Sequence, residues 1–191
     1  MLFRSGADGK LYGATLDEDE WTGTLYSIDP DTYEIEAIGE KQDYGFFDLA
    51  IVPSNSESLY TAFATFVLEV DATTGENPGY GWNLSSVTGG EYIVGISYVD
   101  SFEYSGFLFD EYLVLADDGC VYLTALNNDS GYRLNYSEPL VYQFESEPDT
   151  LIWQSLLYGS DGELYWGKYN DRSSAEIVGT TAERKIEYSA E

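Results

Sequence analysis

Two neighbouring runs decide the class of fold: Leu59-Tyr60-Thr61-Ala62-Phe63 and Phe66-Val67-Leu68-Glu69-Val70-Asp71. Both are short and rich in β-branched and aromatic residues, and the second leads directly into Ala72-Thr73-Thr74-Gly75, a segment suited to a tight turn. Short runs of this composition, separated by turn residues, are typical of antiparallel strands. The stretch therefore predicts two paired strands followed by a turn, and the rest of the chain repeats this pattern.

A tyrosine-containing strand recurs along the chain, with tyrosines at 12, 60, 112 and 165 and spacings of 48, 52 and 53 residues. Other strand-like runs flank each of these strands, and a period near fifty residues is typical of β-propeller blades. We therefore expect an all-β fold, a β-propeller with about four blades of about four antiparallel strands, either a closed ring or part of a larger ring. The four tyrosines should then occupy equivalent places on the second strands of successive blades. A β-sandwich and a single β-solenoid are the alternatives.

The whole chain, 1–191, is expected to be one propeller domain or propeller segment, with approximate blades at 1–42, 43–90, 91–147 and 148–191. The first strand, Leu2-Phe3-Arg4-Ser5, is short, and Lys185-Ile186-Glu187-Tyr188 is the expected last strand. An open ring would leave sheet edges and apolar faces uncovered. Closure of the ring and self-association through open propeller ends are therefore the two expected outcomes.

Two repeats resemble those of quinoprotein-type (PQQ-like) propellers: Leu11-Tyr12-Gly13-Ala14 followed by Gly23 to Thr32, and Leu59-Tyr60-Thr61-Ala62 followed by Val67 to Gly75. The shared pattern is a strand with a Leu-Tyr pair, then a strand ending in Asp-x-x-Thr-Gly, an ending that the third and fourth repeats lack. The fourth repeat, Gln154 to Trp166, is similar to propeller modules in large surface proteins of Gram-positive gut bacteria. The resemblance implies the fold and an extracellular context, but neither an activity nor a bound quinone.

The composition excludes several chemistries. The chain has 35 acidic and 8 basic residues, a formal net charge of −27, one Cys and no His. Without His, His-dependent triads and imidazole metal sites are impossible. Nucleic acid and anionic membrane surfaces are disfavoured as partners, because no basic residue lies between Lys41 and Arg133. We expect no membrane insertion, since no apolar run approaches the roughly 20 residues of a spanning helix.

The densest acidic run, Asp17-Glu18-Asp19-Glu20, lies in the expected hairpin after the first tyrosine strand. Carboxylate oxygens are the ligands that Ca²⁺ prefers, so Asp17, Asp19 and Glu20 are candidate calcium ligands. A solvated hairpin tip is the alternative, and the run lacks the spacing of an EF-hand loop. Calcium is the one cofactor that we leave open, and we expect no other.

Trp21 follows this acidic run and is the candidate ligand-binding residue, because its charged and polar neighbours predict an exposed ring that could stack on a sugar. Trp153 and Trp166 are expected in the core instead. Asp29, Asp31 and Asp71 follow the expected third strands, where Asp accepts backbone N–H bonds in turns. With 35 carboxylates in the chain, no pair stands out, and we assign no catalytic residue.

The expected function is that of a non-enzymatic binding or scaffolding module, extracellular or at the cell surface, with an unidentified protein or glycan as ligand. One alternative is a carbohydrate-active propeller that binds or hydrolyses glycans through carboxylates, which need no His. The other is an acidic protein of a salt-adapted cytoplasm, because solvated carboxylates keep proteins soluble at high salt.

We expect added salt to stabilise the fold. A net charge of −27 makes the compact state repel itself, and salt screens that repulsion over about 10 Å at 0.1 M. The melting temperature should therefore rise as NaCl is added from low salt to about 0.5 M. A melting temperature that stays constant or falls as NaCl is added would contradict this expectation.

Overall fold

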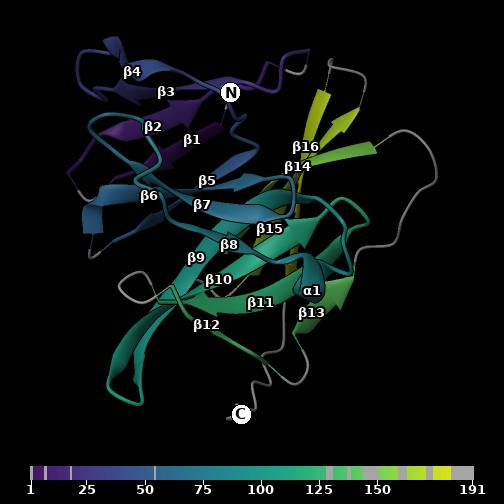
Figure 1. The fold of residues 1–191 in the computed structure, drawn as a ribbon. Helices are drawn as coiled ribbons and strands as arrows, with labels where there is room; N and C mark the ends of the chain where they lie inside the picture. Colours follow the sequence, from purple (N-terminus) through teal and green to yellow (C-terminus); the bar gives the residue numbers. More distant parts are fainter. Residues whose placement is uncertain are drawn as a thin grey trace.

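The computed structural model describes residues 2–6, 8–17, 19–53, 55–127, 131–136, 139–143, 151–158, 163–170 and 174–181. Over these residues the chain forms four antiparallel sheets, each built from strands that are consecutive in the sequence. Figure 1 shows the sheets following one another in chain order, from the purple N-terminal strands to the yellow last ones. The all-β class that the sequence predicts is confirmed.

The first sheet contains β1 (Leu2–Ser5), β2 (Leu11–Ala14), β3 (Gly23–Ile28) and β4 (Ile35–Gln42). The second sheet contains β5 (Asp48–Val52), β6 (Asn55–Phe63), β7 (Phe66–Asp71) and β8 (Gly81–Asn83), and is followed by the short helix α1 (Ser85–Thr88). The third sheet contains β9 (Ile93–Tyr104), β10 (Phe107–Ala116) and β11 (Cys120–Leu126), with β12 (Arg133–Leu134) and β13 (Leu140–Gln143) both paired to β11. The fourth sheet contains β14 (Leu151–Tyr158), β15 (Glu163–Asn170) and β16 (Ser174–Thr181).

The first strands of the four sheets lie together. β1 contacts β5, β5 contacts β9, and β9 contacts β14, which also contacts β5. Each sheet thus continues outward from its first strand, and consecutive sheets face each other. Sheets that radiate from their first strands are the hallmark of propellers, so the fold is propeller-like.

Apolar side chains fill the spaces between consecutive sheets. One cluster, with Leu25 and Leu59, joins the first sheet to the second. A larger cluster, with Tyr60 and Tyr112, joins the second sheet to the third. A third cluster, built on Leu113 and its neighbours, covers the opposite face of the third sheet and includes the half-buried Tyr158 of β14. The core is therefore distributed between sheets, and burial of apolar area there is the main stabilising term.

The four repeat tyrosines Tyr12, Tyr60, Tyr112 and Tyr165 all lie on the second strands of their sheets, as their spacing predicts. The faces that they occupy differ. Tyr12 and Tyr60 face the sheet that follows, whereas Tyr112 faces the preceding sheet and meets Tyr60 with ring centroids 5.3 Å apart. The expected equivalence of Tyr112 with Tyr12 and Tyr60 is therefore wrong.

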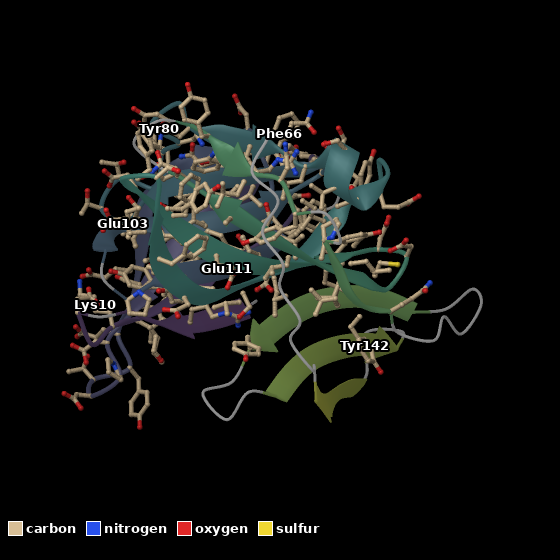
Figure 2. All side chains as sticks on the ribbon, turned by 90° about the horizontal axis from the view of Figure 1, so that it is seen from below. Lys10, Phe66, Tyr80, Glu103, Glu111 and Tyr142 are labelled. Atoms are coloured by element: carbon tan, nitrogen blue, oxygen red, sulfur yellow. The ribbon has the colours of Figure 1, made fainter. Side chains whose placement is uncertain are left out.

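The position equivalent to these tyrosines in the third sheet belongs to Glu111. In the first two sheets the repeat tyrosine pairs with the residue two positions before the turn Asp. Glu111 pairs with Ala125, which likewise lies two positions before Asn127. Glu111 is 1% exposed and accepts a hydrogen bond of 2.9 Å from the hydroxyl of Tyr136. Figure 2 shows Glu111 within the body of the molecule.

The turns after the third strands share one design. The carboxylates of Asp29 and Asp71 each accept N–H bonds from the residues two and three positions later, which confirms the expected turn role of these two side chains. Asp31 takes part in the first of these turns by donating its N–H to Asp29. In the third sheet, the N–H of Gly131 donates to the carbonyl of Asn127 at 3.0 Å, as the N–H of Gly75 does to the carbonyl of Asp71 at 2.8 Å.

The fully buried carboxylate of Asp48 on β5 connects three sheets. Its Oδ1 lies 2.9 Å from Nη2 of Arg4 on β1 and accepts the N–H of Leu49 at 2.8 Å. Its Oδ2 accepts the N–H of Ile96 on β9 at 3.1 Å. The hydroxyl of Ser97 then accepts the N–H of Tyr158 on β14 at 2.8 Å. Polar contacts thus link the first strands of all four sheets.

Some expectations fall outside the described residues. The last strand at 185–188 is one of them, as are the side chains of Trp153 and Trp166. Within the part that the structure does describe, no helix has the length and apolar character needed to cross a membrane.

We expect Asp48→Asn to lower the free energy of unfolding by about 3–5 kcal/mol, because it removes the charged, fully buried member of the ion pair with the partly buried Arg4. Asp43→Asn is the matched control, since Asp43 is exposed in the same part of the chain. Urea unfolding of both variants checks the expectation. A loss below about 1 kcal/mol, the value of an exposed pair, would contradict it.

Candidate functional site

The acidic hairpin of the first sheet holds a lysine between its carboxylates. Nζ of Lys41 lies 3.2 Å from Oδ2 of Asp17 and 2.7 Å from Oε2 of Glu20. The hydrogen bond from Lys41 lowers the pKa of Asp17. The hydrogen bonds to Glu20, the largest cause, and to Asp17 raise the pKa of Lys41. Asp17 Oδ1 also accepts the N–H groups of Asp19 and Glu20. The Lys41 ammonium thus pairs with Asp17 and Glu20, two of the three candidate calcium ligands.

No set of three or more Asp, Glu or Cys side chains among the described residues is grouped as metal ligands would be. Calcium binding by Asp17, Asp19 and Glu20 stays a prediction from the sequence.

Trp21 closes the same hairpin and is 48% exposed. Its backbone has φ of 56°, a left-handed conformation that is strained for a bulky residue. Its ring packs against Phe47 with centroids 5.7 Å apart. The exposure that the sequence predicts is present, and the ligand role of Trp21 stays a prediction.

A cavity of about 460 Å³ opens between the first and second sheets, at the opposite end of the first sheet from Trp21. Its lining is mostly polar and consists of Asp8, Lys10, Tyr12, Ser27, Glu36, Ala37, Ile38, Gly39, Ala72 and Thr73. Its volume is within the range of small-molecule sites. This inter-sheet pocket is the candidate functional site.

Strand pairing explains how distant polar residues meet in the inter-sheet pocket. Tyr12 on β2 pairs with Ser27 on β3, and Ser27 pairs with Glu36 on β4. Residues that are directly opposite in an antiparallel sheet project from the same face. The three side chains therefore form one row across the first sheet, facing the second.

Asp8 lies beside Tyr12, at one end of the row, and two hydrogen bonds fix its carboxylate. The hydroxyl of Tyr12 donates to Oδ2 at 2.9 Å, and the N–H of Lys10 donates to Oδ1 at 3.1 Å. Burial and then this hydrogen bond raise the pKa of Tyr12 to about 12, so the phenol stays neutral at physiological pH. Figure 2 shows Lys10 at the margin of the molecule, and its side chain is exposed.

Two glycines set the distance between the walls of the pocket. Gly39 on β4 has φ of +68°, and a Cβ there would lie 1.8 Å from the carbonyl oxygen of Thr74. Gly75 has φ of +72°, and its Cβ would lie 2.5 Å from the carbonyl oxygen of Ile38. The outer strand of the first sheet thus touches the turn of the second backbone to backbone. A close backbone contact of this kind makes the pocket a pre-formed feature.

Sequence reasoning singled out Tyr12 only as a strand residue, and it missed the pocket. The signal for the pocket is the row formed by Tyr12, Ser27 and Glu36. This row can be recognised only when the register of three strands is known. Ala72 and Thr73 come from another sheet, and no sequence pattern connects them with the row.

No family model matches the sequence, and no curated protein matches it. Among solved structures, the chain is similar to a luciferin-regenerating enzyme with a TM-score of 0.53 and 16% identity, over 98% of this chain and 62% of that one. At this identity the likeness shows a shared fold and nothing about activity.

Two further solved structures are less similar. One is the β-propeller domain of Cps50 (Swd1) from Myceliophteria thermophila, with a TM-score of 0.47, 12% identity, and coverage of 95% of this chain and 57% of that one. The other is a europium-containing methanol dehydrogenase, with a TM-score of 0.44, 13% identity, and coverage of 84% and 34%. The chain thus spans less than two thirds of the length of each of these three proteins.

We expect Gly39→Ala to destabilise the protein more than Gly9→Ala does. Both glycines have positive φ, but a Cβ at Gly9 would meet no atom within 4 Å. Gly9→Ala therefore costs only the left-handed strain, about 1–2 kcal/mol. Gly39→Ala adds a clash with the Thr74 carbonyl, about 1–3 kcal/mol more. Equal unfolding free energies for the two variants in urea would contradict the backbone contact.

Proposed function

We propose that this chain is a non-enzymatic binding module and that the inter-sheet pocket receives a small, hydroxyl-rich ligand such as the terminal sugar of a glycan. The observation that carries the proposal is the pocket itself: about 460 Å³ between two sheets, with a mostly polar lining. Small-molecule sites are usually concave, largely pre-formed, and oriented by a few placed polar groups.

The lining supports a hydroxyl-rich ligand through its hydrogen-bonding groups. The carboxylates of Asp8 and Glu36 accept hydrogen bonds, the ammonium of Lys10 donates them, and the hydroxyl of Ser27 does both. The hydroxyl of Thr73 accepts, because its own O–H already donates to Oδ1 of Asp71. Sugar hydroxyls are themselves both donors and acceptors, so they can satisfy such a lining. Asp8 already accepts two hydrogen bonds that hold its turn, which favours a positioning role over acid catalysis.

The proposal also includes the identity of the four sheets as propeller blades and the location of the protein. We infer that the four sheets are consecutive blades of a ring, either complete or part of a larger one. The contacts of β1, β5, β9 and β14 at their inner edges support this arrangement. An extracellular or cell-surface location agrees with the charge of −27 and with the resemblance of the repeats to bacterial surface modules.

An NMR titration of the isotopically labelled chain with neutral mono- and disaccharides tests the function. We expect shifts at the amides of Lys10, Ser27, Glu36 and Thr73, and no hydrolysis of a disaccharide. Ser27→Ala should weaken binding by about two- to tenfold, the value of one hydrogen bond. Ser5→Ala is the matched control, because Ser5 is exposed on β1 outside the lining. Shifts confined to other regions, or release of monosaccharide, would overturn the proposal.

A further inference from the structure

We propose that the ligand of the inter-sheet pocket carries a protonated amine beside its hydroxyls, as an amino sugar does. This inference rests on the proposed function and specifies the ligand class of the same site. Its basis is the balance and placement of charges in the lining, where two carboxylates, Asp8 and Glu36, stand against the single ammonium of Lys10.

Asp8 offers a pre-organised carboxylate. The Tyr12 hydroxyl and the Lys10 N–H fix its two oxygens, at 2.9 and 3.1 Å. Each carboxylate oxygen can accept a further hydrogen bond, so Asp8 can still receive an N–H from a ligand. Because its orientation is fixed before binding, a ligand amine does not have to order it.

Glu36 offers a second carboxylate on the opposite side of the row. It is exposed on β4 and pairs with Ser27, which itself pairs with Tyr12. Within the described part of the chain, its carboxylate takes part in no hydrogen bond or ion pair. A ligand cation therefore meets at Glu36 a carboxylate that no Lys or Arg of the described residues neutralises.

The single ammonium of Lys10 does not cancel the negative potential of the Asp8 and Glu36 carboxylates. Its ammonium lies close enough to Asp29, outside the lining, to contribute to lowering the pKa of Asp29, after the N–H bonds from Thr32 and Asp31. The negative charge of Asp29 therefore stands close to Lys10 and partly offsets the positive potential of the ammonium. The surrounding chain, at −27, adds to the negative potential. An anionic sugar is repelled here, and a cationic one is attracted.

Three sugars of similar size but different charge test the inference: glucosamine, glucose and glucuronate, titrated into the full chain at equal ionic strength and followed by NMR. We expect glucosamine to bind about two- to fivefold more tightly than glucose, the range of an exposed ion pair, and glucuronate to bind most weakly. Glu36→Gln should remove the advantage of glucosamine over glucose. Glu40→Gln, an exposed carboxylate on the same strand outside the lining, should leave it unchanged.

The outcomes separate the two proposals. Equal binding of glucose and glucosamine in the pocket, or an unchanged preference in Glu36→Gln, overturns the amine inference and leaves the binding module intact. No shift in the pocket with any of the three sugars overturns both proposals. Glucosamine shifts at Asp19 and Glu20 as large as those at Glu36 mean general attraction of cations to an acidic surface, which also overturns the inference.

Discussion

The buried carboxylate of Asp48 is the constraint on which the rest of the structure depends. A carboxylate that is removed from water is tolerated only when charge and hydrogen bonds replace its hydration. Arg4 from the first sheet, the N–H of Leu49 from the second, and the N–H of Ile96 from the third supply that replacement. Each donor comes from a first strand, so the carboxylate is satisfied only when the three sheets converge there. Apolar burial between the sheets supplies most of the stability, and Asp48 selects this arrangement of them.

The inter-sheet pocket follows from the way the first sheet is held on the second. At the inner edge, Arg4 pairs with Asp48, and at the outer edge, Gly39 touches Thr74. Between these two contacts, Leu25 and Leu59 fill part of the space, while the polar row from Tyr12 to Glu36 leaves another part open. The pocket is thus a consequence of two fixed edges and a polar row between them, and its charge sets the class of ligand that we propose.

The sequence predicted the strands well because short β-rich runs and turn residues are local signals. The repeat tyrosines lie on second strands as expected, yet the third repeat is displaced by one residue, so that Glu111 and not Tyr112 is equivalent to Tyr60. A shift of one residue moves a side chain to the other face of a sheet, and spacing alone cannot detect it. The pocket was beyond prediction for a related reason: its residues meet only through strand register and the contact between two sheets. Trp21 and the acidic hairpin attracted attention by composition, but they lie at the other end of the first sheet.

Native-state hydrogen exchange of the Ile96 amide tests the central role of Asp48 most directly. This N–H donates to a side-chain carboxylate from another sheet, so it is protected only while the sheets converge. We expect it to exchange as slowly as the most protected core amides, through global unfolding alone. Exchange at the rate of amides on the exposed outer strand β4 would show that the sheets separate locally at their first strands, and it would contradict the account.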